Sequence, residues 1–298
     1  MRVLIIGCGY VGLAVGAELA RRGHVVFGVR RNPATGSELL SAGIQPLFAD
    51  ITNPTSLAKL PRDCDWVVNC AGSGSSDVAD YRRLYLEGTR NLIAWLAAAP
   101  PARYLYTSST SVYGQDDGSL VNESAPTAPD TDTGRVLVET EQTLLDTART
   151  NGFPGIVLRV AGIYGPGRGY YLREFLRGQA RLEGAGRRFV NMIHRDDVVS
   201  AILAALERGR PGQAYNVCDD EPATLVTVYT WLAETLKLPL PRATPEDPYS
   251  MRRRGATNKR VSNHRLRAEL GCALKFPTFR EGYTAELRRQ GLLPGEAC

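Results

Sequence analysis

The sequence predicts an α/β protein, a Rossmann-type doubly wound parallel sheet with a smaller C-terminal substrate lobe. Three observations predict it. The chain opens with a short apolar strand, a glycine-rich turn and a helical pattern. Strand-like and helix-like segments then alternate as far as residue 165. Glycine-rich or polar turns follow several strands, at the carboxyl ends beyond which such sheets bind their ligands.

The opening unit has the pattern of a dinucleotide site. Residues 2–6 form a short aliphatic run typical of a strand buried on both faces, and GCGYVG follows at residues 7–12. In a GxGxxG turn the first glycine permits the tight turn, the second admits the pyrophosphate, and the third lets helix and strand pack closely. The helix N-terminus adds free N–H groups for the phosphates. The residues expected to bind the cofactor here are Gly7, Gly9, Tyr10, Val11 and Gly12.

The second expected strand, residues 24–29, indicates which dinucleotide is bound. Sites specific for NAD place an Asp or Glu at its end to bind the ribose 2′-hydroxyl. Here Arg30 and Arg31 follow, and the next carboxylate is Glu38. Two guanidinium groups suit a 2′-phosphate, so the sequence predicts NADP(H), with NAD(H) the less favoured cofactor. The alternative is a basic turn that is simply solvated.

The later elements continue the alternation. We expect strands at 45–50, 64–72, 103–107 and 155–160, and helices at 56–60, 80–99 and 133–150. Residues 1–165 would form the dinucleotide-binding domain. Residues 187–217 would return to its sheet, whereas residues 166–186 and 221–298 would form the smaller lobe.

Composition argues against several classes of protein. The chain is 43% hydrophobic and 22% charged with a net charge of +5, which is ordinary for a soluble protein. Its basic cluster, Arg252–Arg254 with Lys259 and Arg260, lacks any recognised nucleic-acid motif, and no apolar run is long enough to cross a membrane. The six cysteines form no CxxC pair, which favours reduced thiols in the cytoplasm and no metal site. We therefore expect a small-molecule substrate, without nucleic acid or membrane partners.

Seven motifs together resemble the extended short-chain dehydrogenase/reductase family, the NAD(P)-dependent epimerase/dehydratase group. They are the turn at 7–12, Asp50 in FADIT, NCAG at 69–72, TSSTSVYG at 107–114, AGIYGPGR at 161–168, IHRDD at 193–197 and YNV at 215–217. The resemblance spans nearly the whole chain and is more specific for fold than for reaction. The glycine turn departs by one residue from the family's usual GxxGxxG, which places the chain among atypical members.

The resemblance implies further site residues. Asp50 and Ile51 would border the adenine, and Ala71 and Gly72 the ribose next to the nicotinamide. Ser109, in the SSxxVYG pattern, would be the catalytic serine that hydrogen-bonds the substrate oxygen. A homodimer through the helices at 80–99 and 133–150 is also an expectation at the level of the family.

The family's catalytic pair is Tyr-x-x-x-Lys, in which the lysine lowers the pKa of the tyrosine that transfers the proton. Alignment of PDTDTGRVLVETE (129–141) with the family pattern puts Thr133 at the tyrosine and Leu137 at the lysine, and Gly134 and Glu141 keep the register. None of the 13 tyrosines has a lysine four residues later. The sequence therefore predicts that the usual acid/base pair is missing.

Three functions remain open. The first is an NADP(H)-dependent oxidoreductase that reduces a C=O or C=N group, with a proton from Tyr113, Tyr164, His194 or Tyr85. Each of these residues has a purely structural alternative. The second function is a non-catalytic NADP(H) sensor or scaffold. The third is a nucleotide-sugar epimerase or dehydratase, which would rely heavily on the missing pair.

The smaller lobe is expected to set substrate choice, because its arginines suit a carboxylate or a phosphate. These arginines could equally be ordinary surface residues. The residues concerned are Arg168, Tyr170, Tyr171, Arg173 and Arg187, with Tyr249 and Arg252–Arg254 as further candidates.

Overall fold

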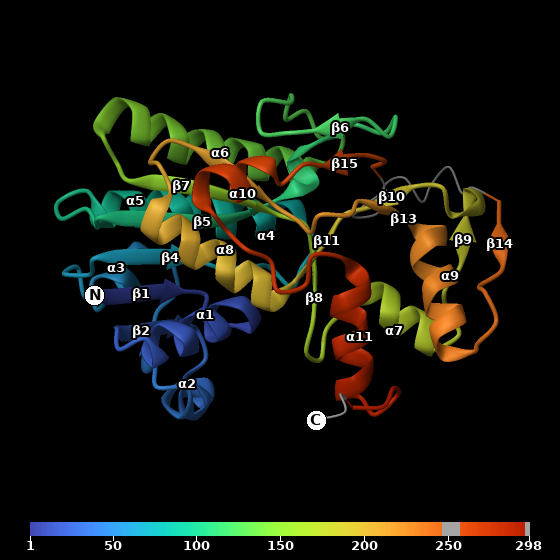
Figure 1. Ribbon diagram of the computed structural model, residues 1–298. Coiled ribbons are helices and arrows are strands. Elements are labelled where there is room, and N and C mark those ends of the chain that lie inside the picture. The colour runs from blue at the N-terminus through green and yellow to red at the C-terminus, as the bar shows by residue number, and fades with distance from the viewer. Residues whose placement is uncertain (246–256, 296–298) are drawn as a thin grey trace.

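A computed structural model describes residues 1–245 and 257–295, and its centre is one seven-stranded parallel sheet (Figure 1). The strand order is β12-β7-β5-β4-β1-β2-β3. The strands are β1 (Arg2–Ile6), β2 (Val25–Arg30), β3 (Gln45–Phe48), β4 (Trp66–Asn69), β5 (Arg103–Ser109), β7 (Gly155–Val160) and β12 (Ala214–Val217). The order reverses between β1 and β4, where doubly wound sheets bind dinucleotides. The predicted fold class is confirmed.

Helices cover both faces of the sheet. One face carries α1 (Tyr10–Arg21), α2 (Gly36–Ser41), α8 (Arg195–Arg208) and α10 (His264–Leu270). The other carries α3 (Pro54–Leu57), α5 (Gly88–Leu96) and α6 (Asp132–Asn151), and the short α4 (Val78–Tyr81) leads into α5 through a π-helical turn at Arg82–Glu87. Because both faces are covered, the central strands are nearly continuous apolar runs, and every residue of β7 is buried.

Local sequence explains where several helices begin and end. The Thr131 hydroxyl accepts a hydrogen bond from the Gly134 N–H at 3.1 Å and so caps α6, which ends at Gly152 with φ +68°. Thr278 and Glu281 form a capping box at the start of α11 (Phe279–Arg289). None of the helices in the described ranges is long and apolar enough to cross a membrane.

The smaller lobe has its own core. It is built from α7 (Tyr170–Leu176), α9 (Leu225–Leu236) and α11, beside the short pair β9 (Leu182–Glu183) and β14 (Ala243–Thr244), and it lies to one side of the sheet (Figure 1). Its buried apolar side chains include Leu172, Phe175, Val228, Leu232 and Phe279.

Two expectations about this half of the chain were wrong. Residues 187–191 do not return to the main sheet, which ends at β12 beyond β7. Instead β10 (Phe189–Val190) pairs with β13 (Ala223–Thr224), and β11 (Met192–His194) pairs with β8 (Gly162–Tyr164). In addition, α10 packs against α8 and β12 and so belongs to the sheet domain rather than to the lobe.

Candidate active site

The glycine turn between β1 and α1 has the geometry of a phosphate site. Gly7 has φ +73°, and a Cβ there would lie 2.4 Å from the Ala71 Cα. A Cβ on Gly12 would lie 2.8 Å from the Gly7 carbonyl oxygen, so Gly7 and Gly12 are needed for packing within the protein. A Cβ on Gly9 would lie 4.0 Å from the Gly7 carbonyl oxygen, which is ordinary contact, and the residue is exposed. The space outside Gly9, at the N-terminus of α1, fits a dinucleotide phosphate.

The basic pair after β2 is divided between two environments. The Arg30 side chain is 14% exposed, and its guanidinium donates to the Cys8 carbonyl at 2.5 Å and to the Glu38 carboxylate at 2.6 Å. Arg31 is exposed. The first carboxylate after the strand therefore neutralises Arg30, and Arg31 is the arginine of this pair that is open to a ligand.

The other residues expected around the cofactor lie at the same edge of the sheet, at the ends of β3 and β4. The Asp50 carboxylate accepts hydrogen bonds from the N–H and hydroxyl of Thr52, both at 2.9 Å. Ile51 is buried against Gly88 and Ala71 packs on Gly7, whereas Gly72 is exposed. Asp50 and Gly72 are thus better placed to meet a ligand than the buried Ile51 side chain.

Ser109 lies at the carboxyl end of β5, beside the end of β7. It is partly exposed, and its hydroxyl oxygen accepts a hydrogen bond from the Ser111 N–H at 3.1 Å. That bond caps the 3₁₀ turn Thr110–Val112 and leaves the hydroxyl hydrogen free to donate. Ser109 can therefore orient a substrate oxygen or nitrogen.

Tyr113 belongs to a buried polar network. Its hydroxyl donates to Asn216 and accepts from the Arg159 guanidinium, both at 2.8 Å. Arg159 pairs with Glu141 at 2.8 Å, and Ser108 donates to the same carboxylate at 2.5 Å. Burial raises the pKa of the Tyr113 phenol. With no exposed surface and both hydroxyl functions engaged, Tyr113 has the position of a structural residue rather than of a proton donor.

Tyr164, another suggested proton donor, is buried at the lobe boundary. Its hydroxyl lies against α11, where a Cβ on Gly282 would come within 1.9 Å, and burial raises its pKa. The hydroxyl has no hydrogen-bond partner among the described residues. The Tyr85 hydroxyl accepts a hydrogen bond from the Ser73 N–H at 2.9 Å, and burial raises the pKa of this phenol.

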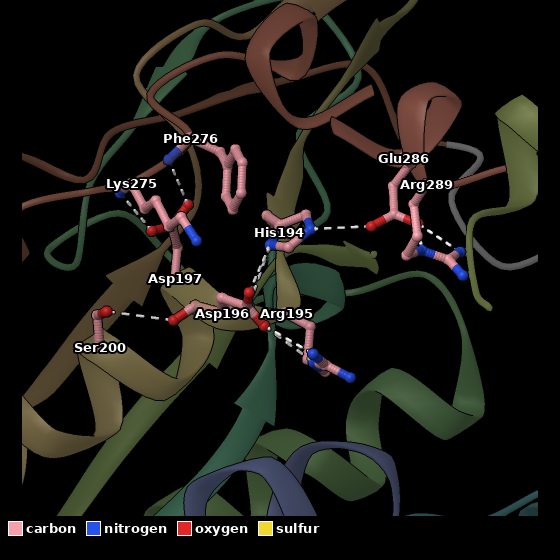
Figure 2. Close-up of polar contacts among 9 residues, drawn as sticks. All are labelled: His194, Arg195, Asp196, Asp197, Ser200, Lys275, Phe276, Glu286 and Arg289. Atoms are coloured by element: carbon pink, nitrogen blue, oxygen red, sulfur yellow. Dashed lines mark hydrogen bonds and ion pairs between the residues drawn. The ribbon is translucent and has the colours of Figure 1, made fainter. Parts of the chain in front are cut away.

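His194 joins the sheet domain to the lobe (Figure 2). Its Nδ1 accepts from the Asp196 N–H at 3.2 Å and caps α8, so the neutral ring carries its proton on Nε2, which lies 3.4 Å from the Glu286 carboxylate of α11. The Phe276 ring lies 4.0 Å from the imidazole, centroid to centroid. Burial lowers the pKa of His194 despite the nearby carboxylates of Asp196 and Glu286. Both nitrogens are engaged, Nδ1 within the sheet domain and Nε2 across to the lobe.

The two positions that the sequence alignment assigns to the usual catalytic pair lie in the first turns of α6. Thr133 is partly exposed, whereas Leu137 is 5% exposed and packs in the main core. Gly134 and Glu141, which the alignment also uses, are buried on the same helix. Gly134 packs against Pro129 and Thr131, and Glu141 reaches Ser108.

Lys259, which the sequence placed in a basic cluster, is a buried lysine. Its ammonium donates to the Tyr113 carbonyl oxygen at 2.9 Å and to the Thr257 hydroxyl at 2.5 Å, and the residue is 3% exposed. Burial lowers its pKa to about 8. No carboxylate pairs with it within the described part of the chain.

The residues expected to choose the substrate are dispersed. Arg168 lies over the ring of Tyr10, Tyr170 is exposed beside Tyr171, and Arg173 pairs with Glu174. Arg187 is exposed. Tyr249 and Arg252–Arg254 fall outside the described residues.

The seven-stranded sheet and its glycine turn define a dinucleotide-binding protein of the Rossmann type. The profile of the NAD dependent epimerase/dehydratase family matches residues 3–218, so the chain belongs to that family, which is of the extended short-chain dehydrogenase/reductase type. The chain is 29% identical over 287 residues to Protein YeeZ of Escherichia coli, covering 93% of this chain and 96% of that protein. It is 28% identical over 318 residues to a 3-diazoavenalumate denitrifying reductase of a Streptomyces species, covering 96% and 100%.

Solved structures show the same fold. A functionally unknown conserved protein from Silicibacter pomeroyi is 32% identical with a TM-score of 0.77, over 97% of this chain and 99% of that one. A dTDP-glucose 4,6-dehydratase from Bacillus anthracis, in complex with NAD, is 20% identical with a TM-score of 0.80, over 98% and 100%.

Proposed function

We propose that this protein is an NADP(H)-dependent oxidoreductase that reduces a C=O or C=N group of a small molecule, with a proton donor other than the usual Tyr/Lys pair. The observation that carries the proposal is the combination of an open glycine turn and a free Ser109 hydroxyl with a buried Leu137 at the lysine position. Hydride transfer needs a positioned nicotinamide and an electrophile, whereas sugar epimerisation also needs a strong base. The likeness to a protein named a reductase supports reduction.

In this mechanism the cofactor supplies the hydride, and the chain supplies binding and orientation. The N–H groups at the start of α1 would bind the pyrophosphate. Ser109 would donate its hydroxyl hydrogen to the substrate oxygen or nitrogen, where negative charge develops. Because Leu137 is apolar, no cation at this point of α6 lowers the pKa of a neighbouring acid. A substrate that is already activated, such as an iminium, would lessen the need for one.

The preference for NADP(H) is part of the proposal and rests on Arg31. Glu38 pairs with Arg30, so removing the Arg31 guanidinium should weaken NADPH binding and leave NADH binding unchanged. Titration of both nucleotides against Arg31→Gln measures this preference, with Arg149→Gln on the far end of α6 as the matched control. Equal affinity of the wild-type protein for NADH and NADPH would remove the preference.

Reduction itself is tested by single-turnover oxidation of bound NADPH against panels of carbonyl and imine compounds. The proposal predicts loss of NADPH with at least one class. The main alternative is a non-catalytic NADP(H) sensor, favoured by the buried positions of Tyr113, Tyr164 and His194. Tight binding without turnover would support the sensor. Interconversion of nucleotide sugars without net oxidation would instead support an epimerase.

A further inference from the structure

Two arginines meet on one tyrosine of the glycine turn. The guanidinium carbons of Arg168 and Arg195 lie 5.2 and 5.4 Å from the centroid of the Tyr10 ring. Tyr10 is the first residue of α1 and follows Gly9 directly. Two positive side chains therefore converge on the side chain of the first residue of α1, the helix whose N-terminus fits a dinucleotide phosphate.

The chain builds this convergence from two separate elements. The Gly165–Arg168 turn closes through two backbone hydrogen bonds of 2.9 Å, and its glycines adopt left-handed conformations, with φ +140° at Gly165 and +70° at Gly167. A Cβ on Gly165 would lie 3.1 Å from both the Tyr10 hydroxyl oxygen and the His194 Nε2, so only glycine lets the turn approach Tyr10 this closely. Arg195 is the first residue of α8, which packs against α1.

The local charge balance favours an anion. Arg195 pairs with Asp196 at 2.9 Å, but Arg168 is exposed and has no ion pair within residues 1–245 and 257–295. Glu286, the other nearby carboxylate, pairs with Arg289 at 2.6 Å. The N-terminus of α1 adds the positive end of the helix dipole. Asp196 thus pairs with Arg195, while the Arg168 guanidinium lacks a paired carboxylate among the described residues, an arrangement that an anionic ligand would stabilise.

We propose that Arg168 and Arg195 bind the pyrophosphate of the nicotinamide dinucleotide, and so hold the turn after β8 and the start of α8 against the cofactor. This inference rests on the dinucleotide binding that the proposed function requires. The pyrophosphate is common to NADPH and NADH, so the two arginines add affinity for both nucleotides and select neither. Arginine suits the task because its planar donors match two phosphate oxygens at once.

The test is equilibrium binding of NADPH and NADH, followed by fluorescence, to Arg168→Gln, Arg195→Gln and the double variant. Arg173→Gln is the matched control, because Arg173 also lies over a tyrosine ring, 5.8 Å from the centroid of Tyr170, but on α7. We expect each single variant to bind both nucleotides about tenfold more weakly, since charge-assisted hydrogen bonds are lost. The affinity of each variant should also depend less steeply on salt concentration. Arg168→Lys should recover part of the loss, and the control should bind as the wild type does.

Unchanged affinity for both nucleotides in the folded double variant would overturn the inference. A rise in the substrate KM with unchanged nucleotide affinity would also overturn it, because the arginines would then bind a substrate anion. These outcomes are independent of the reaction. A protein that shows the expected binding losses but reduces no carbonyl or imine would refute the proposed function and leave this inference standing.

Discussion

The Tyr113 hydroxyl accepts a hydrogen bond from the Arg159 guanidinium at 2.8 Å, beneath the loop that carries Ser109. The same hydroxyl donates to Asn216 on β12, and Arg159 also pairs with Glu141 on α6. Three segments far apart in the chain thus meet at one phenol. Tyr113 therefore stabilises the Ser109 loop from the protein interior and does not face a substrate.

Tyr113→Phe should lower the stability of the fold and leave the rate of the reaction unchanged. Losing the hydroxyl leaves a buried amide oxygen and a guanidinium each without one partner, which should lower the free energy of unfolding by about 1–3 kcal/mol. Urea denaturation measures this cost. A fall in kcat of about a hundredfold, the size expected for loss of a general acid, would instead make Tyr113 the proton donor.

Gly9 and Gly12 should respond in opposite ways to the same added methyl group. Gly12→Ala puts a Cβ 2.8 Å from the Gly7 carbonyl oxygen, and such overpacking should cost about 1–3 kcal/mol of stability. Gly9→Ala meets no atom closer than 4.0 Å, so its stability should stay near that of the wild type. Its methyl group would occupy the phosphate space, and NADPH should bind about tenfold more weakly, or by about 1.4 kcal/mol. Thermal unfolding and nucleotide titration separate the two effects, and unchanged NADPH affinity in Gly9→Ala would place the phosphate elsewhere.

Ser109→Ala should reduce kcat by about a hundredfold, because it removes the donor aimed at the developing charge. Its affinity for NADPH should not change. Ser109→Thr keeps both the hydroxyl and the cap of the 3₁₀ turn and should restore most of the activity, while Ser111→Ala controls for changes in the loop. Full activity in Ser109→Ala would assign this serine to capping alone.

Lys259 should make the free energy of unfolding depend on pH in the alkaline range. In the folded protein burial lowers its pKa to about 8 from an ordinary value of 10.5. Between these values the unfolded chain binds more protons, so the contribution of this group to the free energy of unfolding rises with pH, by up to about 3 kcal/mol. Lys259→Met should lack this rise, whereas the exposed Lys59→Met should keep it. Urea denaturation at several pH values from 8 to 10.5 provides the measurement, and parallel curves for the wild type and Lys259→Met would contradict it.

Features encoded in short stretches were predictable from the sequence. The glycine turn, Arg30–Arg31 and the Ser109 loop depend on residues at fixed spacings beside a strand, and strand alternation then brings their ends to one edge of the sheet. The structure could be inferred this far because each signal is local.

The partners of the buried polar groups were not predictable, because they are distant in the sequence. Tyr113 and Asn216 are 103 residues apart, and His194 and Glu286 are 92 apart. Lys259 reaches Tyr113 across 146 residues. No local pattern records these contacts, so Tyr113 and His194, which are suited by type to proton transfer, proved to be buried and hydrogen-bonded.

The central claim is that the bound dinucleotide delivers a hydride to a C=O or C=N group. Its most direct test is deuterium transfer from NADPH that carries deuterium at both C4 positions of the nicotinamide, with a product of the carbonyl or imine panel analysed by mass spectrometry. The account predicts one deuterium on the reduced carbon and stoichiometric formation of NADP⁺. Deuterium that stays on the bound nucleotide with every compound of both panels would contradict it.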